Sequence, residues 1–172
     1  KKTDKDYGTF VSMLMCEILG EKPKMAIRGS VLVFTLSSVA YIEAFERMGL
    51  KRGNKVRQQV GIPEWILRNK RYSKLCLRGL VDTDGGVYFH HHIVAKKRYI
   101  NFGLSFTNAS LPIILGAKKI LESFKLKVFM PRQRNLYIYK FEDIKRYFQI
   151  IGSDNPKHWK RLKIYQKMCK IM

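Results

Sequence analysis

An internal repeat of the order helix, strand, strand, helix constrains the fold of this chain more than any other feature. The order spans 10–48 and returns at about 111–151, roughly 100 residues later, which indicates that one supersecondary unit was duplicated. Each copy ends in a similar turn, from Gly49 to Lys55 in the first and from Gly152 to Lys157 in the second. A predicted helix and hairpin over 72–107 precede the second copy but have no counterpart before the first. We therefore expect one complete repeat and one repeat whose front is missing.

Hydrophobic periodicity and turn residues predict the individual elements. Helices are expected at 10–19, from a cap at Ser37 or Ser38 to about 48, at 64–67, 72–82, 111–125, 142–150 and 156–170. Strands are expected at 24–28, 31–36, 87–94, 99–107, 127–130 and 136–139, with 95–98 joining the central pair. The domain prediction is a partial first repeat at 1–50, a basic linker with a short helix at 51–71, and a complete second repeat with a C-terminal helix at 72–172.

The charge balance restricts the class of partner. The chain has 172 residues, of which 34 are Lys or Arg and 13 are Asp or Glu, so its net charge is +21. With 46% hydrophobic residues the chain is expected to fold, and so large a positive excess predicts a polyanionic partner. Nucleic acid is the first interpretation, an anionic membrane surface the second, and a merely soluble, thermostable basic protein the third.

Neither a secretory leader nor a membrane span is evident, since no apolar run approaches the roughly 18 residues that a span requires. Cys16, Cys76 and Cys169 are odd in number and far apart, which predicts buried thiols rather than a disulfide framework or a zinc site. We expect a protein of the prokaryotic cytoplasm, associated with the nucleoid, or of an organelle, and not a secreted one.

The residues with the clearest chemistry lie at 77–85, which read Leu-Arg-Gly-Leu-Val-Asp-Thr-Asp-Gly. Gly79 in mid-helix costs about 1 kcal/mol relative to Ala, so the close approach of a second helix along Gly79 and Leu80 is expected. Asp82 and Asp84 end the predicted helix, where the macrodipole disfavours anions. Carboxylates in such a place favour a metal site. The alternative is a plain helix end with solvated aspartates.

Two other metal sites are excluded by spacing. An EF-hand loop counted from Asp82 would require Gly and Glu where Val87 and Ile93 stand. The run His90-His91-His92 invites a zinc interpretation, but adjacent strand residues point to opposite faces, so no more than two could share an ion. His91 is expected to pack beneath the sheet.

Segment 77–85 resembles the LAGLIDADG motif, and Gly53–Val56 and Val60–Ile66 add to a resemblance to archaeal and intein-type homing endonucleases over about 7–165. The resemblance implies an α+β fold, in which αββαββα repeats form antiparallel saddle-shaped sheets on the DNA major groove; here the first repeat is incomplete. It also implies Mg²⁺, or another hard divalent cation, on Asp84 and the backbone carbonyl of Thr83, a structural role for Asp82, and no organic cofactor.

Members of the family also place a basic residue near the metal. Lys96, Lys97 and Arg98 are the candidates for this role in the present sequence, and we take Lys97 as the candidate catalytic residue. Arg78 departs from the motif's Ala, so its side chain must point away from the helix pair. A larger departure is that a double-strand cut requires two such acids, and this sequence shows one.

Strand alternation assigns the faces of the predicted sheet, with 100, 102, 104 and 106 beneath the helices. Side chains on the opposite face are predicted to meet base edges in the major groove: Tyr88, His90, His92, Tyr99, Asn101, Ser105, Tyr137 and Tyr139. Basic residues near the loops are predicted to hold phosphates: Lys96, Arg98, Arg132 and Arg134. The alternative is a solvated outer sheet face.

Three functions remain open. The first is a site-specific, Mg²⁺-dependent endonuclease that cuts double-stranded DNA at long asymmetric sites. The second is a catalytically silent DNA-binding protein derived from such an enzyme, and the third is an intron RNA maturase. A missing first-repeat fragment, or a homodimer formed through 75–85, would supply the second acid.

Overall fold

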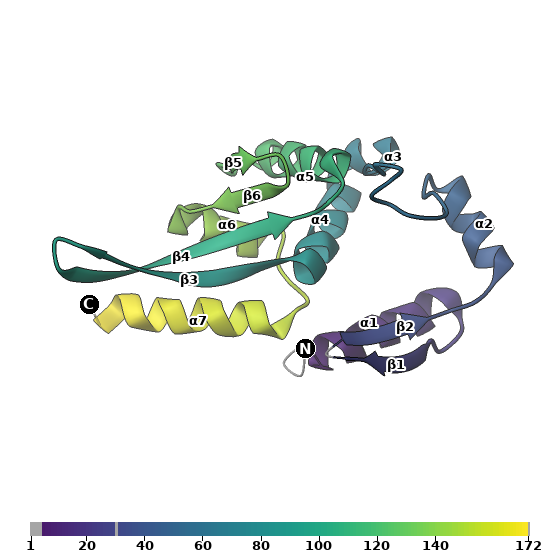
Figure 1. The fold of residues 1–172 in the computed structure, drawn as a ribbon, viewed down its shortest axis with the longest axis horizontal. Helices are drawn as coiled ribbons and strands as arrows, with labels where there is room; N and C mark the ends of the chain where they lie inside the picture. The colour runs from purple at the N-terminus through teal and green to yellow at the C-terminus, as the bar shows by residue number, and fades with distance from the viewer. Residues whose placement is uncertain (1–4, 30, 172) are drawn as a thin grey trace.

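A computed structural model of the chain describes residues 5–29 and 31–171, and Figure 1 shows its arrangement. The first part contains α1 (Lys5–Leu19), β1 (Lys24–Arg28), β2 (Val31–Thr35) and α2 (Val39–Arg47), and α3 (Glu64–Leu67) follows a linker. The second part contains α4 (Lys70–Asp84), β3 (Gly85–Val94), β4 (Lys97–Thr107), α5 (Leu111–Ser123), β5 (Phe129–Arg132), β6 (Asn135–Ile138), α6 (Phe141–Ile150) and α7 (Pro156–Ile171). The predicted α+β class with antiparallel sheets is confirmed.

The hydrophobic core lies in the second part of the chain. Its antiparallel sheet has the strand order β3-β4-β6-β5, and α4, α5, α6 and α7 all pack on one side of it. Phe102, Leu104 and Phe106 point from β4 into this core, as alternation predicted, and each is at most 2% exposed. Burial of each side chain of this size contributes about 1.5–3 kcal/mol, and this energy holds the sheet against the helices.

Strands β3 and β4 form a hairpin that extends beyond the rest of the sheet (Figure 1). Only Leu104–Thr107 of β4 pair with β6, so the distal part of the hairpin is a two-stranded arm. Its turn is Ala95-Lys96, with φ of 48° and 64°, rather than the predicted four residues. Positive φ at both positions gives a tight turn whose twist matches that of the strands.

The first part of the chain has almost no core of its own. Gly8 and Pro23 are the buried residues among 5–29 and 31–60, and no residue before Ile62 belongs to the described core cluster. Apolar side chains that would form a core are exposed instead, including Ile18 (67%), Ile27 (70%) and Val39 (67%). This part therefore lacks the packing that stabilises its sequence-related copy.

The structure preserves the internal repeat, since α1-β1-β2-α2 and α5-β5-β6-α6 have the same element order. The turns that end the two copies also agree. Gly49 and Gly152 both have positive φ, 95° and 77°. Asn54 Oδ1 accepts from the backbone N–H of Val56 at 2.9 Å, and Asn155 Oδ1 accepts from that of Lys157 at 3.1 Å.

Some predicted boundaries and burials differ from the structure. Helix α4 starts at Lys70 rather than 72, because the Asn69 side chain caps it by accepting from the N–H groups of Arg71 and Tyr72. Pro63 is the N-cap of α3 rather than its first residue. The expectation of buried thiols is wrong for Cys16 and Cys169, which are exposed, and Cys76 is half-buried. Among the described helices, none is both long and apolar enough to cross a membrane.

Candidate functional site

Asp82, near the end of α4, is a buried structural acid with only 4% exposure. Its Oδ1 accepts from Ser153 Oγ at 2.5 Å, and its Oδ2 accepts from the backbone N–H of Asp154 at 2.7 Å. His158 Nδ1 lies 3.2 Å from Oδ1, and Asn155 Nδ2 donates to the Asp82 carbonyl at 3.2 Å. These contacts fix the α6–α7 loop on α4 and leave Asp82 no accessible lone pair for a ligand.

Asp84, two residues further on, has the opposite environment. Its side chain is 41% exposed, and its Oδ2 accepts from Asn108 Nδ2 at 3.1 Å. Among the residues that the structure describes, none donates a hydrogen bond to its Oδ1. The next residue, Gly85, begins β3, so this carboxylate stands where the motif helix meets the sheet.

Lys55 is the basic group that the fold brings to Asp84, with Nζ 4.0 Å from Oδ2. The linker reaches this place because Ser110 Oγ donates to the Val60 carbonyl at 2.6 Å, and because Ile62 packs on Gly116 of α5. We did not predict Lys55 as a site residue. The available signal was its place in Gly53–Val56, which carried part of the family resemblance.

The oxygen ligands near Asp84 suit a hard divalent cation in kind but not in number. The Asp84 carboxylate and the Thr83 carbonyl are the available protein oxygens, while the Thr83 hydroxyl donates back to Gly79 O at 2.9 Å. No three His, Cys, Asp or Glu side chains are grouped for a metal within the described ranges. Mg²⁺ is commonly held by one or two carboxylates together with substrate phosphates and water, so these residues fit an ion that a bound phosphate or a second acid completes.

The expected helix partner of Gly79 is not found in the described chain. A Cβ at Gly79 would meet nothing within 4 Å in the described chain, so the close helix contact stays a prediction for a partner, while Leu80 packs partly on the core. Tyr72, Leu75, Gly79 and Thr83 are exposed and follow one side of α4. We call these four residues the open face of α4.

Arg78 points away from the open face, as its position in the motif required. Its Nε donates to the Ile151 carbonyl at 2.7 Å, and its Nη1 lies 3.3 Å from Asp154 Oδ1. Arg78 and Asp82 are four residues apart, so both reach the α6–α7 loop from the same side of α4. The departure from the motif's Ala therefore stabilises the loop and leaves the open face clear.

The side of the sheet that faces away from the helices, here called the outer sheet face, carries the residues that alternation assigned to it. They are Tyr88, His90 and His92 of β3, Tyr99, Asn101, Gly103 and Ser105 of β4, and Tyr137 and Tyr139 at β6. Phe129 of β5, which was not predicted, joins them as the cross-strand partner of Tyr137. Burial raises the pKa of Tyr88, and the phenols of Tyr139 and then Tyr137 raise it further. The structure thus gathers side chains from all four strands on one surface.

The basic residues of the hairpin lie at its far end, away from Asp84. The ten residues of β3 lie between Asp84 and this end of the hairpin. At about 3.3 Å per residue, they place Lys96, Lys97 and Arg98 about 30 Å from Asp84. The structure therefore does not bring Lys97 to the Asp84 carboxylate. Arg98 pairs with Ile93 and shares the side of Ile100, so it does not lie on the outer sheet face.

Arg132 and Arg134 lie at the other edge of the sheet. Arg132 is the cross-strand partner of Asn135, which belongs to the outer sheet face, and Arg134 is exposed in the β5–β6 turn. Both can therefore approach a ligand that covers this face. Together with Lys96 at the tip of the hairpin, they place positive charge at two distant ends of this surface.

The three histidines are split between the two sides of the hairpin, as the pleat requires. His90 and His92 stack with ring centroids 5.3 Å apart, and His92 stacks on Tyr99 at 5.6 Å. His91 is exposed, so the expectation that it packs beneath the sheet is wrong. Helix α7 does reach this part of the hairpin, since Tyr165 Oη donates to the carbonyl of Ile100, the cross-strand partner of His91, at 3.4 Å, but it leaves the His91 side chain uncovered.

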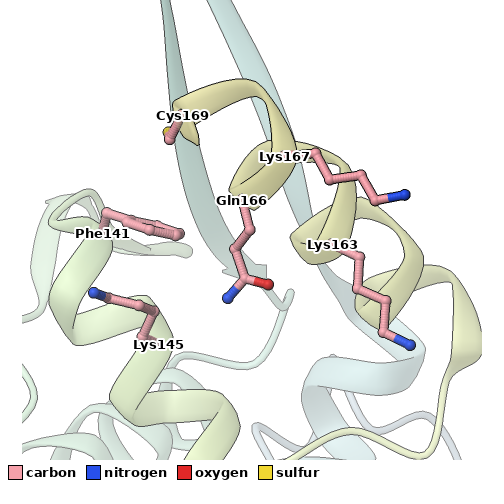
Figure 2. A pocket seen from close by; sticks show the side chains of 6 residues that line it. All are labelled: Phe141, Lys145, Lys163, Gln166, Lys167 and Cys169. Carbon is pink, nitrogen blue, oxygen red and sulfur yellow. The ribbon is translucent and has the colours of Figure 1, made fainter. Parts of the chain in front are cut away.

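A second basic region lies between α6 and α7, around a cavity of about 470 Å³. Figure 2 shows its six lining residues, and the ammonium groups of Lys163 and Lys167 point away from Phe141 and Lys145. Lys145 lies 3.6 Å from Glu142 and over the Phe141 ring. The charges therefore do not converge on a single anion site.

Comparison with known proteins gives a distant likeness. No family model and no curated protein matches the chain. Among solved structures it is similar to the group I intron-encoded homing endonuclease I-CeuI complexed with DNA, with a TM-score of 0.43 and 10% identity over 85% of this chain and 78% of that one. At these values the likeness does not establish membership of a family.

Proposed function

We propose that this chain binds DNA and hydrolyses phosphodiesters at Asp84 with a divalent metal, as a site-specific endonuclease of the LAGLIDADG type. The contrast between the two motif carboxylates carries the proposal. Asp82 is buried and fully bonded, whereas Asp84 is half exposed, lies beside Lys55 and has an open oxygen. Membership of the family is part of the proposal and rests on 77–85 together with 53–66.

Each group near Asp84 has a role in this proposal. Asp84 Oδ1 and the Thr83 carbonyl would hold Mg²⁺, and a bound Mg²⁺ supplies a Lewis acid that activates water and stabilises the leaving oxygen. Asn108 orients the carboxylate by donating to Oδ2. The Lys55 ammonium neutralises part of the phosphate charge, since electrostatic stabilisation is the largest contribution in phosphoryl chemistry.

A double-strand cut also requires a second carboxylate, and the open face of α4 is where we place a second motif helix. That helix would come from a first repeat in a longer protein or from a second copy of this chain. The exposed apolar side chains of 5–50 fit the same proposal, in which this part is an incomplete repeat. A silent DNA-binding protein or an intron RNA maturase is the second candidate, favoured because no three metal-binding side chains are grouped within 5–29 and 31–171.

Nicking of supercoiled DNA with Mg²⁺ tests the proposal. We expect Asp84→Asn to abolish nicking while DNA affinity stays within about twofold, because the amide keeps its shape and loses its charge. Glu64→Gln is the matched control, since Glu64 is an exposed carboxylate on α3. Undiminished nicking by Asp84→Asn would remove Asp84 from the mechanism. Nicking by neither wild type nor variant, with intact DNA binding, would favour the silent protein.

A further inference from the structure

The side chains of the outer sheet face are mainly aromatic. They include Tyr88, His90, His92, Tyr99, Phe129, Tyr137 and Tyr139, whereas Asn101 and Ser105 are the polar residues that alternation had also assigned there. Another polar pair on this face, Thr107 and Asn135, is already occupied by a mutual hydrogen bond of 2.9 Å. Such a surface offers many ring faces and few donors or acceptors.

Tyr88 has a special position in the middle of this surface. Its cross-strand partner is Gly103, and a Cβ added there would lie 2.5 Å from Tyr88 Cζ. The phenol ring therefore covers the backbone of β4 at a position where only glycine leaves room. On the neighbouring strand, Tyr137 and Tyr139 stand parallel, with centroids 5.4 Å apart and an interplanar angle of 6°. The rings on this face thus form two stacked groups, one on the hairpin (His90, His92 and Tyr99) and one at β5 and β6 (Phe129, Tyr137 and Tyr139). Tyr88 lies near enough to the second group for the phenols of Tyr139 and Tyr137 to raise its pKa.

Duplex DNA and an unpaired strand demand different side chains. Bases in a duplex are stacked on their neighbours and present only edges, which Arg, Asn and Gln read with hydrogen bonds. Unpaired bases present their ring faces, and aromatic side chains on a sheet bind them with little regard to sequence. Positive charge from Lys96 at the tip of the hairpin and from Arg132 on the edge strand β5 is placed for the phosphates of a strand that lies along the sheet.

We infer that the outer sheet face binds unpaired nucleotides, stacking their bases on its tyrosines and histidines. The inference deepens the proposed function, and it rests on that function only in requiring a nucleic acid as partner. Opened DNA and the loops of a folded RNA offer the same chemistry, namely exposed base planes on a phosphate chain. Reading of duplex base edges by the same residues is the competing outcome.

Fluorescence anisotropy of the full chain, with EDTA present to prevent cutting, tests the inference. The probes are a single-stranded DNA of about a dozen nucleotides, the RNA of the same sequence, and the DNA duplex, all at the same ionic strength. We expect at least one single strand to bind about tenfold more tightly than the duplex. The DNA and RNA arms identify which strand the protein prefers.

Tyr139 provides the sharpest variants, because it is 54% exposed and its loss should not affect folding. Tyr139→Ala is expected to weaken single-strand binding about fivefold or more, whereas Tyr139→Phe keeps the ring and stays within about twofold. Leu115→Ala, which removes an exposed apolar side chain on α5, is the control and should leave binding unchanged.

Three results would overturn the inference. Equal or tighter binding of the duplex would show that base edges are read, while leaving the proposed function in place. An equal loss of single-strand affinity in Tyr139→Phe and Tyr139→Ala would show that the hydroxyl, rather than stacking on the ring, binds the strand. If none of the probes binds, the inference and the proposed function both fail. Nicking of a plasmid distinguishes this result from failure of the inference alone, because a nicked plasmid shows that the proposed function still holds.

Discussion

Replacing Asp82 by Ala tests the division of labour between the two motif carboxylates. The change removes the acceptors of two charge-assisted hydrogen bonds, from Ser153 Oγ at 2.5 Å and from the Asp154 N–H at 2.7 Å. Each such bond contributes about 1.5–3 kcal/mol, and the donors are left in a partly buried site. We expect the free energy of unfolding to fall by about 3–5 kcal/mol.

Asp82→Asn should be milder than Asp82→Ala. In one orientation its amide oxygen accepts from the Asp154 N–H while its amide nitrogen donates to Ser153 Oγ, and Ser153 can then donate to the Asn155 carbonyl, 3.3 Å away. This pattern keeps the hydrogen bonds and loses only the charge, so a cost of about 1–2 kcal/mol is expected. Asp84→Ala should change stability by less than about 0.5 kcal/mol, since it removes an exposed anion from a helix C-terminus.

Urea unfolding followed by tryptophan fluorescence measures these differences. Trp159 is a suitable reporter because its indole N–H donates to the Ser153 carbonyl at 2.7 Å, within the loop that Asp82 holds. An Asp82→Ala chain within about 1 kcal/mol of wild type would refute the assignment of Asp82 as a structural acid. So would an Asp84→Ala chain that is destabilised to the same extent.

Two further predictions concern the open face of α4 and the buried phenol next to Asp82. Gly79→Ala should raise the free energy of unfolding of the isolated chain in urea by about 0.5–1 kcal/mol, because the added methyl meets no atom within 4 Å. If a second helix docks on the open face, the same change should weaken any assembly seen by sedimentation. An unchanged free energy of unfolding would contradict the first expectation. Burial, followed by the charges of Asp82 and Asp154, raises the pKa of Tyr7 from 10.0 to about 12. The neutral phenol therefore stabilises the fold fully below pH 10, and this contribution is lost as the pH rises to 12. Tyr7→Phe should therefore lose less stability than wild type over that interval in urea titrations at stepped pH, and parallel curves would contradict the shift.

Local patterns in the sequence predicted much of the fold. Period-two alternation placed Phe102, Leu104 and Phe106 in the core because one side of β4 is covered by helices along most of its paired length. The same rule failed for His91, since alternation gives the side of a residue but not whether neighbouring side chains cover it. The direction of Arg78 was predictable because a long side chain cannot occupy a close helix contact.

The neighbours of Asp84 depended on packing between distant segments. Lys55 reaches it only because the linker is held on α5, through the hydrogen bond from Ser110 Oγ to the Val60 carbonyl and the contact of Ile62 with Gly116. No local pattern in the sequence contains that information. The choice of Lys97, by contrast, neglected a simple length, because ten strand residues carry the hairpin turn far from the helix end.

Helix α4 explains why one acid is structural and the other available for chemistry. Successive residues of an α-helix are about 100° apart around its axis. Asp84, which follows Asp82 by two residues, therefore points to nearly the opposite side of the helix. Asp82 and Arg78 share the side that holds the α6–α7 loop, and this attachment fixes the end of the helix relative to the sheet. Asp84 can then remain half exposed at a defined place, where Asn108 Nδ2 donates to its Oδ2 and Oδ1 stays open. The glycine on the open face lowers helix stability and makes no close contact within the described chain, which agrees with our proposal that a second helix packs there.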